Sequence, residues 1–444
     1  MSKTNPARGM RDFLPADVRK REYVIGIIKE VYESYGFEPL ETPAVENLET
    51  LMGKYGEEGN QLIFKILKRG EKLEQSLDSL GGLGSQGSKE DADEEIALTS
   101  KTSKTSKTSQ TDLSDLALRY DLTVPLARVV AHHRNDLPKF FKRYQIQPVW
   151  RADRPARGRF REFYQCDVDA IGSTSVVVEA ELISAVCDIL IRLGFDDFVI
   201  NLNHREVLLG ILAVVGILGD EDVASTVIAL DKLDKIGKDG VRDELHEKGV
   251  NRAYVEKLFV FVDQYRALYS GNIGTETYND RMARTLSDHF LLGDNIVDPS
   301  VLPILDLSTI IDLLKTVGQN QYSRFVRLNP TLARGLSYYT GAIFEITVPD
   351  LAGSLGGGGR YDGLIGMFGK EQIPACGFSL GLERILVVME ERDMFPPEIA
   401  DSTPADVMVT IWSDETIAES LKLAAELRTA GIRVTVYPEP DKFG

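Results

Sequence analysis

The sequence predicts an α+β protein in which a helical module interrupts a core that contains antiparallel strands. Two neighbouring strand patterns, 145–152 and 163–171, are joined by a short loop that contains Pro155 and Gly158, as in an antiparallel hairpin. Helical periodicity fills almost all of 205–317, which suggests a separate module inserted in a mixed chain. The pattern strand, helix, strand over 406–437 predicts the start of an α/β unit.

Length and composition favour a multidomain cytoplasmic protein. The 444 residues suggest about three domains. No apolar run is long enough to span a membrane, and the N-terminus lacks the apolar stretch of a secretion signal. Cys166, Cys187 and Cys376 lie far apart, which predicts reduced thiols. The five histidines show no metal-binding spacing, so we expect no metal site built from protein side chains.

The charge distribution singles out one segment. The chain carries a net charge of -17, which argues against loose, sequence-independent binding of nucleic acid but not against specific binding through a local basic patch. Residues 139–161 hold eight lysines and arginines, and only Asp153 is acidic there. The hairpin therefore has a cationic tip at 153–160.

The first third of the chain predicts a core that is interrupted by an insertion. An amphipathic helix over 17–35 ends at Gly36. Short patterns follow: extended residues 37–43, a helix-like stretch 46–52, a strand 61–67 and charged residues 68–74. Residues 76–111 are rich in Gly, Ser, Lys and Thr with an SKT repeat, and they lack the apolar side chains of a core. We expect them to form a disordered insertion.

The remaining elements follow the same periodicity rules. Loops are expected in the helical block near Gly219, Gly249, Gly271 and Gly293. Outside that block we expect strands at 116–120, 198–202, 324–328, 337–348, 375–380, 406–412 and 433–437, helices at 124–133, 179–193, 382–391 and 415–429, and a linker at 394–404.

The second strand of the hairpin has one polar and one apolar face. Side chains two residues apart share a face, so Gln165, Asp167 and Asp169 point one way, with Phe163, and Tyr164, Cys166, Val168 and Ala170 point the other way. Arg151 ends the opposing strand. A fixed arginine near carboxylates suits a small zwitterion or a nucleotide phosphate. The charge cluster taken alone would fit a solvated surface hairpin with ion pairs better.

Familiar nucleotide-binding loops are absent from the sequence. No GxxxxGK[ST] is present, and no GxGxxG lies between a strand and a helix. The glycine run 356–359 is followed by Arg-Tyr-Asp and suits a strand over which a ligand lies closely, although a glycine-rich turn is the default interpretation.

Five segments together give the chain a family resemblance. They are LRYDLTVPLARV (118–129), FKRYQIQPVWRADRPARGRFREFYQCDVDAIG (141–172), LARGLSYYTGAIFE (332–345), GGGRYDGL (357–364) and ACGFSLGLERIL (375–386). With them, nearly the whole chain outside the low-complexity insertion resembles the histidyl-tRNA synthetases, which are class II aminoacyl-tRNA synthetases. Residues 35–48 with Pro43 resemble motif 1, the hairpin resembles motif 2 and 377–384 resemble motif 3.

The resemblance implies a fold and a domain division. It implies the antiparallel class II sheet flanked by helices, divided between 1–204 and 321–395, a helical insertion domain at 205–320 and the start of an anticodon-binding domain at 404–444. We expect that last domain to be incomplete, because only one βαβ unit of it is present.

It also implies a reaction. L-Histidine and ATP form histidyl-adenylate, and the histidyl group then passes to tRNA(His), with Mg²⁺ bridging the β- and γ-phosphates. The resemblance implies a homodimer joined through motif 1. Arg151 would bind the α-phosphate and Arg334 would lie on its other side. Arg384 would hold the far phosphates near the adenine, and Arg159 is a further phosphate ligand.

The resemblance places the amino acid as well. Asp169 would accept a hydrogen bond from one imidazole nitrogen and Tyr339 would meet the other. Tyr338 and Tyr361 would line the pocket, while the α-ammonium would bind to Asp121, Thr123 and Gln165. Simpler roles stay open: Asp121 as a helix N-cap, Arg384 in a surface ion pair, and Tyr338 and Tyr339 as core strand residues. Neighbours on a strand face opposite ways, so we expect Tyr339 rather than Tyr338 to enter the pocket.

Some positions depart from the family pattern. Ser337 stands where the family often has Asp, and Asp121 and Asp169 are one methylene shorter than the Glu of many relatives. A catalytically inactive synthetase paralogue, acting as a regulatory or sensor subunit, is therefore the alternative function. The presence of Arg151, Arg334 and Arg384 argues against it, and RGLSYYTG (334–341) argues against another class II synthetase.

Overall fold

The computed structural model describes residues 4–81, 113–270, 275–291, 303–317, 321–333, 338–400 and 403–439. Within this part of the chain, eight strands form one sheet in the order β1-β5-β6-β11-β10-β9-β7-β8. Only the two edge pairings, β1 with β5 and β7 with β8, are parallel. The strands are β1 (Glu38–Pro39), β5 (Phe141–Trp150), β6 (Glu162–Ile171), β7 (Val199–His204), β8 (Val326–Leu328), β9 (Ala342–Thr347), β10 (Gly356–Arg360) and β11 (Ala375–Gly381).

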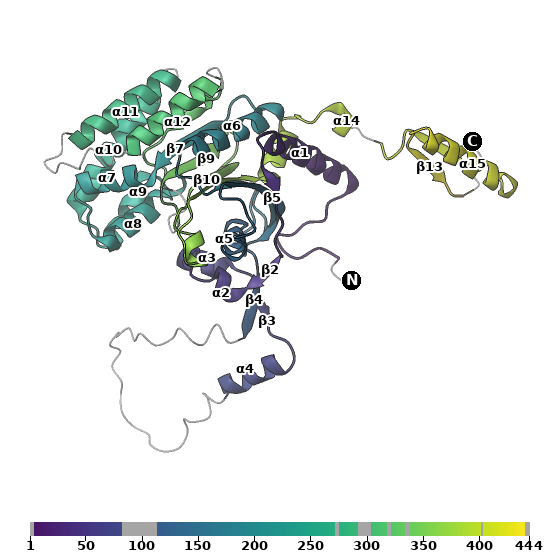
Figure 1. Cartoon of the computed structure of the whole chain (residues 1–444), viewed down its shortest axis with the longest axis horizontal. Helices are drawn as coiled ribbons and strands as arrows, with labels where there is room; N and C mark the ends of the chain where they lie inside the picture. The colour runs from purple at the N-terminus through teal and green to yellow at the C-terminus, as the bar shows by residue number, and fades with distance from the viewer. Residues whose placement is uncertain are drawn as a thin grey trace, which may run out of the picture.

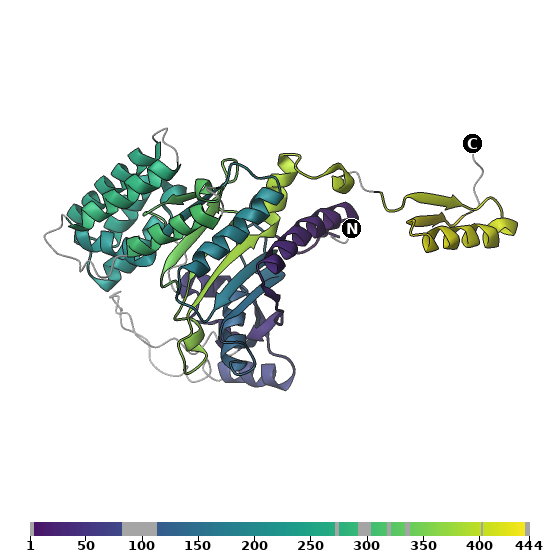
Figure 2. The same ribbon diagram turned by 45° about the horizontal axis from the view of Figure 1, so that its top comes forward.

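Three helices cover one face of this sheet: α1 (Pro15–Ser34), α6 (Val177–Arg192) and α13 (Leu382–Glu391). Figure 2 shows α1 and α6 running along the sheet. Cys166, Val168 and Ala170 of β6 are buried under these helices, as the alternating pattern predicts. The opposite face of β6 is therefore left for polar groups.

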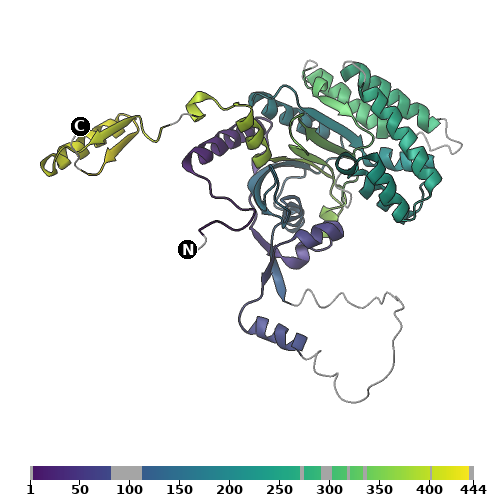
Figure 3. The ribbon, with the colours of Figure 1, turned by 180° about the vertical axis from the view of Figure 1, so that it is seen from behind.

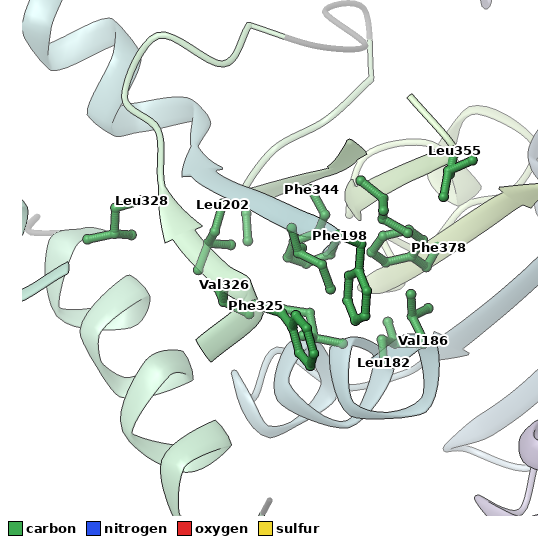
Figure 4. Close-up of a cluster of buried hydrophobic side chains, with 14 of the residues drawn as sticks. Leu182, Val186, Phe198, Leu202, Phe325, Val326, Leu328, Phe344, Leu355 and Phe378 are labelled. Atoms are coloured by element: carbon green, nitrogen blue, oxygen red, sulfur yellow. The ribbon is translucent and has the colours of Figure 1, made fainter. Parts of the chain in front are cut away.

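Aromatic side chains fill the core where α6 meets the far half of the sheet (Figure 4). The rings of Phe344 and Phe378, from β9 and β11, are stacked with centroids 5.6 Å apart, and those of Phe198 and Phe325 are stacked at 4.0 Å. Figure 4 shows Leu182 of α6 beneath these rings. This packing fixes the strands that form the site to a rigid support.

A smaller sheet of order β2-β4-β3 lies against the other side, with β2 (Val45–Asn47), β3 (Lys65–Leu67) and β4 (Ser114–Leu118). Helices α2 (Leu48–Leu51), α3 (Gly56–Leu62) and α5 (Thr123–His132) accompany it, and α4 (Glu71–Gly81) follows β3. A second apolar cluster joins α2, β4 and α5 to the residues that follow β10. This cluster brings the segment before α5 next to the polar face of β6.

The helical block follows β7 and precedes β8, so it is inserted at one edge of the sheet (Figures 1 and 3). It contains α7 (Arg205–Val215), α8 (Asp220–Leu230), α9 (Leu233–Glu247), α10 (Arg252–Ser270), α11 (Thr275–Leu291) and α12 (Pro303–Val317), and the short helix η2 (Ser323–Phe325) leads into β8. Gly237 kinks α9 with φ 70°, a value that glycine adopts readily.

The last described residues form a βαβ unit with parallel β12 (Val407–Thr410) and β13 (Val434–Tyr437). Between them lie the short helix η4 (Asp414–Thr416) and α15 (Ile417–Thr429), and the preceding linker contains α14 (Pro397–Ala400). Figure 1 shows this unit apart from the large sheet. In the part of the chain that the structure describes, no helix is long and apolar enough to cross a membrane.

Three expectations about local structure were wrong. The strand predicted for 61–67 starts at Lys65, because Asn60 accepts a hydrogen bond from Gly53 N (3.1 Å) and 56–62 close into α3. The insertion was placed too early: residues 76–81 belong to α4, where Ser76 donates to Lys72 O (2.9 Å). The rest of the proposed disordered segment, 82–111, lies outside the described residues.

The strand predicted for 337–348 starts later, at Ala342. Tyr338 is in a turn, where Thr340 N donates to Arg360 O (2.8 Å), and Ser337 lies outside the described residues. Because Tyr338 and Tyr339 lie before the strand rather than in it, the rule that neighbouring strand residues face opposite sides does not apply to them.

Candidate active site

The hairpin of β5 and β6 builds a layer of buried polar side chains on the face away from the helices. Its register places Arg143 opposite Asp169, Gln145 opposite Asp167 and Gln147 opposite Gln165. Arg143 and Gln145 are fully buried, and Asp167 and Asp169 are 2% and 3% exposed. A polar layer this deep is unlike the solvated surface hairpin that the charge pattern alone suggested.

A small pocket opens onto this layer. Its lining combines carboxylates, aromatic rings and bare backbone from α5, β6, β10, β11 and the turn before β9: Thr123, Asp167, Asp169, Tyr338, Tyr339, Gly357, Gly358, Tyr361, Gly377, Phe378 and Ser379. Five of the seven residues expected to bind histidine are therefore among the lining residues. Tyr338 and Tyr339 both line the pocket, which corrects the expectation that only one could, because the turn lets both rings face the same side.

Asp169 is held from two sides. Tyr361 Oη donates to Oδ1, and Arg143 Nη2 lies 2.8 Å from Oδ2 in an ion pair whose angles fall outside hydrogen-bond geometry. Burial raises the pKa of Asp169, while Arg143 and the Tyr361 hydrogen bond act in the opposite direction. Arg143 was not among the expected site residues. The sequence did offer a signal for this arginine: it is a charged residue within a strand whose neighbouring residues Phe141 and Tyr144 are buried.

Asp121 and Gln165 lie beside the lining residues. Asp121 Oδ1 accepts from Val124 N (3.1 Å) at the start of α5 and from Tyr55 Oη (2.9 Å). The N-cap residue of α5 is Leu122 rather than Asp121, but the Asp121 carboxylate still binds a backbone N–H of the first turn, as the capping interpretation expected. Gln165 Nε2 donates to Ser379 Oγ (2.8 Å), and its Oε1 is a buried acceptor without a hydrogen bond.

Glycines form the floor of the pocket. A β-carbon at Gly377 would overlap Asp169 Oδ1 and lie 2.6 Å from Asp169 Cγ. A β-carbon at Gly358 would overlap the carbonyl oxygen of Gly377. The glycine run is therefore a strand without side chains, as one of the two sequence interpretations proposed, and it lets a ligand approach the backbone closely.

Two candidate arginines flank the pocket at the tip of the hairpin. Arg151 Nε donates to Tyr120 O (3.0 Å), and the guanidinium lies 4.3 Å from the centre of the Tyr120 ring and 5.1 Å from that of Phe163. Among the described residues no carboxylate forms an ion pair with Arg151. Arg159 instead pairs with Asp153 at 2.9 Å and is half exposed.

Arg384 lies in the first turn of α13. Its Nη1 donates to Ser354 O. Its side chain lies against Gly158 of the hairpin loop, so closely that a β-carbon added at Gly158 would be 3.3 Å from Arg384 Cγ. The neighbouring Glu383 points the other way, where it pairs with Arg21 of α1 at 2.8 Å and accepts from Tyr164 N (2.9 Å). Arg384 is thus directed to the hairpin loop rather than along a surface helix. Arg334 lies outside the described residues.

The arrangement separates two kinds of charge. Carboxylates and tyrosines gather in the pocket, and Arg151 and Arg384 approach the hairpin tip at its edge. Such a site can hold a cationic group in the pocket and an anion beside the arginines. With the antiparallel sheet and its three helices, this defines the catalytic domain of a class II aminoacyl-tRNA synthetase.

The comparisons with known proteins identify the family. The sequence model described as "Histidyl-tRNA synthetase" matches residues 9–77, 92–268 and 299–385. The histidine--tRNA ligases of Flavobacterium johnsoniae and Cytophaga hutchinsonii are 41% and 40% identical to this chain, over 100% of the chain and 89% of each relative. The chain belongs to the histidyl-tRNA synthetase family, whose members are ATP-dependent aminoacyl-tRNA ligases.

Solved structures agree with this assignment. The crystal structure of histidyl-tRNA synthetase from Nostoc sp. PCC 7120 is 30% identical and superposes with a TM-score of 0.71, covering 100% of this chain and 88% of that one. A structure titled as an ATP phosphoribosyltransferase regulatory subunit/histidyl-tRNA synthetase from Bacillus halodurans C has a TM-score of 0.70 at 21% identity. That second likeness shows the fold alone.

Proposed function

We propose that this chain activates L-histidine with ATP to histidyl-adenylate and transfers the histidyl group to tRNA(His). The observation that carries the proposal is the acidic, tyrosine-lined pocket at the base of a hairpin that presents Arg151 without an ion-pair partner among the described residues. Histidine offers a cationic ammonium and a polar ring to such a pocket and a carboxylate to the arginines.

In the first step the histidine carboxylate attacks the α-phosphate of ATP and pyrophosphate leaves. Arg151 binds the α-phosphate, and its hydrogen bond to Tyr120 O fixes the guanidinium in place before the substrates bind. Arg334 lies on the other side of the phosphate in this proposal, and Arg384 and Arg159 bind the more distant phosphates. The arginines supply charge and position, which are the main requirements of phosphoryl chemistry with a carboxylate nucleophile.

The amino acid is oriented by its two ends. Gln165 Oε1, Asp121 and Thr123 accept hydrogen bonds from the ammonium group, and the unpartnered Gln165 oxygen supports this role. Asp169 and Tyr339 contact the imidazole ring. The ring is enclosed by Tyr338 and Tyr361, which line the same pocket.

Magnesium enters this proposal through the nucleotide. Among the described residues no three His, Cys, Asp or Glu side chains are grouped as metal ligands. In this proposal Mg²⁺ would arrive with the nucleotide, since the ion usually keeps several waters and substrate phosphates as ligands. When bound, it would neutralise charge on the departing pyrophosphate.

The wider organisation is also proposed. We assign 1–204 and 321–395 to the catalytic core, 205–320 to a helical insertion domain and 404–444 to an anticodon-binding domain. The chain acts as a homodimer joined through the motif 1 region, residues 35–48. It works in the cytoplasm, which the three buried free thiols support.

The test is ATP–pyrophosphate exchange on the purified chain with each of the twenty amino acids. We expect exchange with histidine alone, and charging of tRNA(His) in the second step. Folded protein that binds histidine but exchanges no pyrophosphate with any amino acid would contradict the proposal. It would favour the inactive paralogue and direct attention to Ser337 and the shortened carboxylates.

Replacing Tyr55 with phenylalanine tests how Asp121 is held. The substitution keeps the ring, whose centre lies 4.5 Å from that of Tyr120, and removes the hydrogen bond to Asp121. A bond to a charged group contributes about 1.5–3 kcal/mol, so we expect the KM for histidine to rise about tenfold or more. The KM for ATP should stay nearly constant. An unchanged histidine KM in exchange assays would show that Tyr55 does not orient Asp121.

Replacing Gly377 with alanine tests whether the bare strand forms the pocket floor. The new methyl group would displace the carboxylate of Asp169. We expect histidine-dependent exchange to fall by about a hundredfold or more, which corresponds to about 2.7 kcal/mol of lost transition-state binding. The matched control is Gly363→Ala, because no atom lies within 4 Å of the β-carbon position of Gly363. Equal activity of the two variants would refute the steric argument.

A further inference from the structure

The segment before α1 packs against the hairpin loop, and the proposed reaction gives it no role. Residues 9–13 form this segment, the N-terminal brace. At its first residue, Gly9 O accepts a hydrogen bond from Arg161 N (2.8 Å) in the second limb of the loop. A β-carbon at Gly9 would lie 2.8 Å from Arg161 Cγ and 3.0 Å from Pro155 Cγ. The backbone of the brace therefore fits closely between the two limbs of the loop.

Side chains of the brace add a stack in which cations and aromatic rings alternate. The guanidinium carbon of Arg11 lies 3.4 Å from the centre of the Phe160 ring and 4.9 Å from that of Phe13. The same Phe13 ring lies 4.1 Å from the guanidinium carbon of Arg21, which in turn lies 4.7 Å from the Tyr164 ring. A cation over the face of a ring is attracted by it. One stack thus runs from the hairpin loop through the brace to α1 and β6.

The two ends of this stack lie beside two arginines that are proposed to bind ATP. At the outer end, Phe160 directly follows Arg159 in the hairpin loop. At the inner end, Arg21 pairs with Glu383 at 2.8 Å, and Glu383 directly precedes Arg384. Arg21 and Glu383 are 8% and 3% exposed, so the inner end is fixed in the core. The stack therefore connects the loop that carries Arg159 to a buried ion pair.

We propose that the N-terminal brace orients the hairpin loop for ATP, and that Arg11 and Phe13 are positioning residues for Arg159. The inference rests on the proposed function and deepens it. Arg159 pairs with Asp153 of the same loop, and Arg161 Nε donates to Asp153 O (3.0 Å). Because the brace holds the two residues that follow Arg159, the loop keeps one conformation. Arg159 then has only to exchange a carboxylate for a phosphate when ATP binds.

The consequence of losing the brace falls on ATP rather than on histidine. A loop that is no longer held populates other conformations, and the apparent affinity for its ligand falls with the fraction of molecules that remain competent. Where the stack reaches β6, it does so at Tyr164, whose side chain packs with the apolar core on the face opposite the histidine pocket. Histidine affinity should therefore not depend on the brace.

The experiment is calorimetry of ATP binding and of histidine binding to the full chain and to Phe13→Leu. Leucine keeps an apolar side chain but removes the ring that both arginines contact. We expect the Kd for ATP to rise about tenfold, which corresponds to about 1.4 kcal/mol, while the Kd for histidine stays within about twofold of the parent value. Phe13→Tyr retains an aromatic face and should restore the parent affinity for ATP.

Arg11→Ala tests the outer end of the stack and keeps the inference testable if Phe13→Leu does not fold. Arg11 is exposed, so its loss should leave the core intact. A cation over a ring contributes less at an exposed site than at a buried one, so we expect the Kd for ATP to rise by about threefold to fivefold.

Phe395→Leu is the matched control. The Phe395 ring likewise carries a cation, with Lys20 Nζ 5.1 Å from its centre, and it meets the Tyr23 ring edge-on at 6.4 Å. Both partners lie on α1 rather than in the hairpin loop, so this variant should bind ATP and histidine like the parent. The melting temperature of each variant separates a lost ATP affinity from general destabilisation.

Two results would overturn the inference. One is an unchanged ATP affinity in folded Phe13→Leu or Arg11→Ala protein. The other is an equal loss of ATP and histidine affinity, which would give the brace a general structural role. The proposed function fails in a different way, through the absence of histidine-dependent pyrophosphate exchange in the unsubstituted chain.

Discussion

Replacing Arg151 with alanine is expected to lower the rate of histidine-dependent ATP–pyrophosphate exchange by about a hundredfold to a thousandfold, the usual cost of losing one oriented donor to a developing charge. The guanidinium is held by Tyr120 O at 3.0 Å and packs against two aromatic rings, so it is oriented before ATP binds. The loss should appear in kcat and in kcat/KM for ATP. Single-turnover measurements of adenylate formation would locate it in the chemical step.

Arg151→Lys is the informative companion variant. Lysine keeps the positive charge but loses the planar fork and most of the stacking on Tyr120 and Phe163. We expect a rate between those of the parent and the alanine variant. Histidine binding, measured without ATP, should change little in both variants. A large loss of histidine affinity would mean that Arg151 orders the amino acid pocket rather than the phosphate.

Replacing Glu179 with alanine is expected to destabilise the protein by about 3–5 kcal/mol, because it removes the bidentate counter-ion of a buried guanidinium and leaves only Asp362 Oδ1, at 3.3 Å. Glu179, on α6, is 2% exposed and binds Arg360 at the end of β10 through both carboxylate oxygens, at 2.6 and 2.7 Å. This ion pair and the hydrogen bond from Arg360 to Ser173 O (2.9 Å) join the covering helix to the sheet that carries the pocket. Urea unfolding measures the loss.

An exposed ion pair provides the comparison for this effect. Glu256 binds Arg242 at 2.7 Å on the helical block, but Glu256 is more than half exposed. Solvent screens such pairs, so Glu256→Ala should cost less than about 1 kcal/mol. Similar losses for the two variants would show that burial does not set the value of the Arg360 pair. Glu179→Gln, which retains hydrogen bonding, should fall between them.

Local patterns were sufficient for the elements whose two faces differ strongly. The hairpin strands and the buried face of Cys166, Val168 and Ala170 follow from alternation, which depends only on neighbouring residues. The helix at 382–391 was predicted with the bounds of α13. Where the pattern was short or mixed with glycine and tyrosine, as at 61–67 and 337–341, turns and hydrogen bonds to distant residues determined the local structure.

The family and its reaction were accessible from the sequence because the five matching segments carry their identity in local order. The contacts within the pocket were not accessible. Arg143 faces Asp169 only through the strand register, and Tyr55 reaches Asp121 across 66 residues of chain. Both depend on how separate segments pack.

The sequence by itself determined the fold class, the order of most elements, the family and a set of candidate residues. The tertiary structure decided which of those residues meet. Tyr361 reaches Asp169 past β11, which lies between β6 and β10, and Gly377 leaves the necessary space because it has no side chain. Asp167, by contrast, lies opposite an amide rather than an arginine. Periodicity specifies the face on which a side chain lies, but only the packed sheet specifies its neighbours, because those neighbours come from strands far apart in the chain.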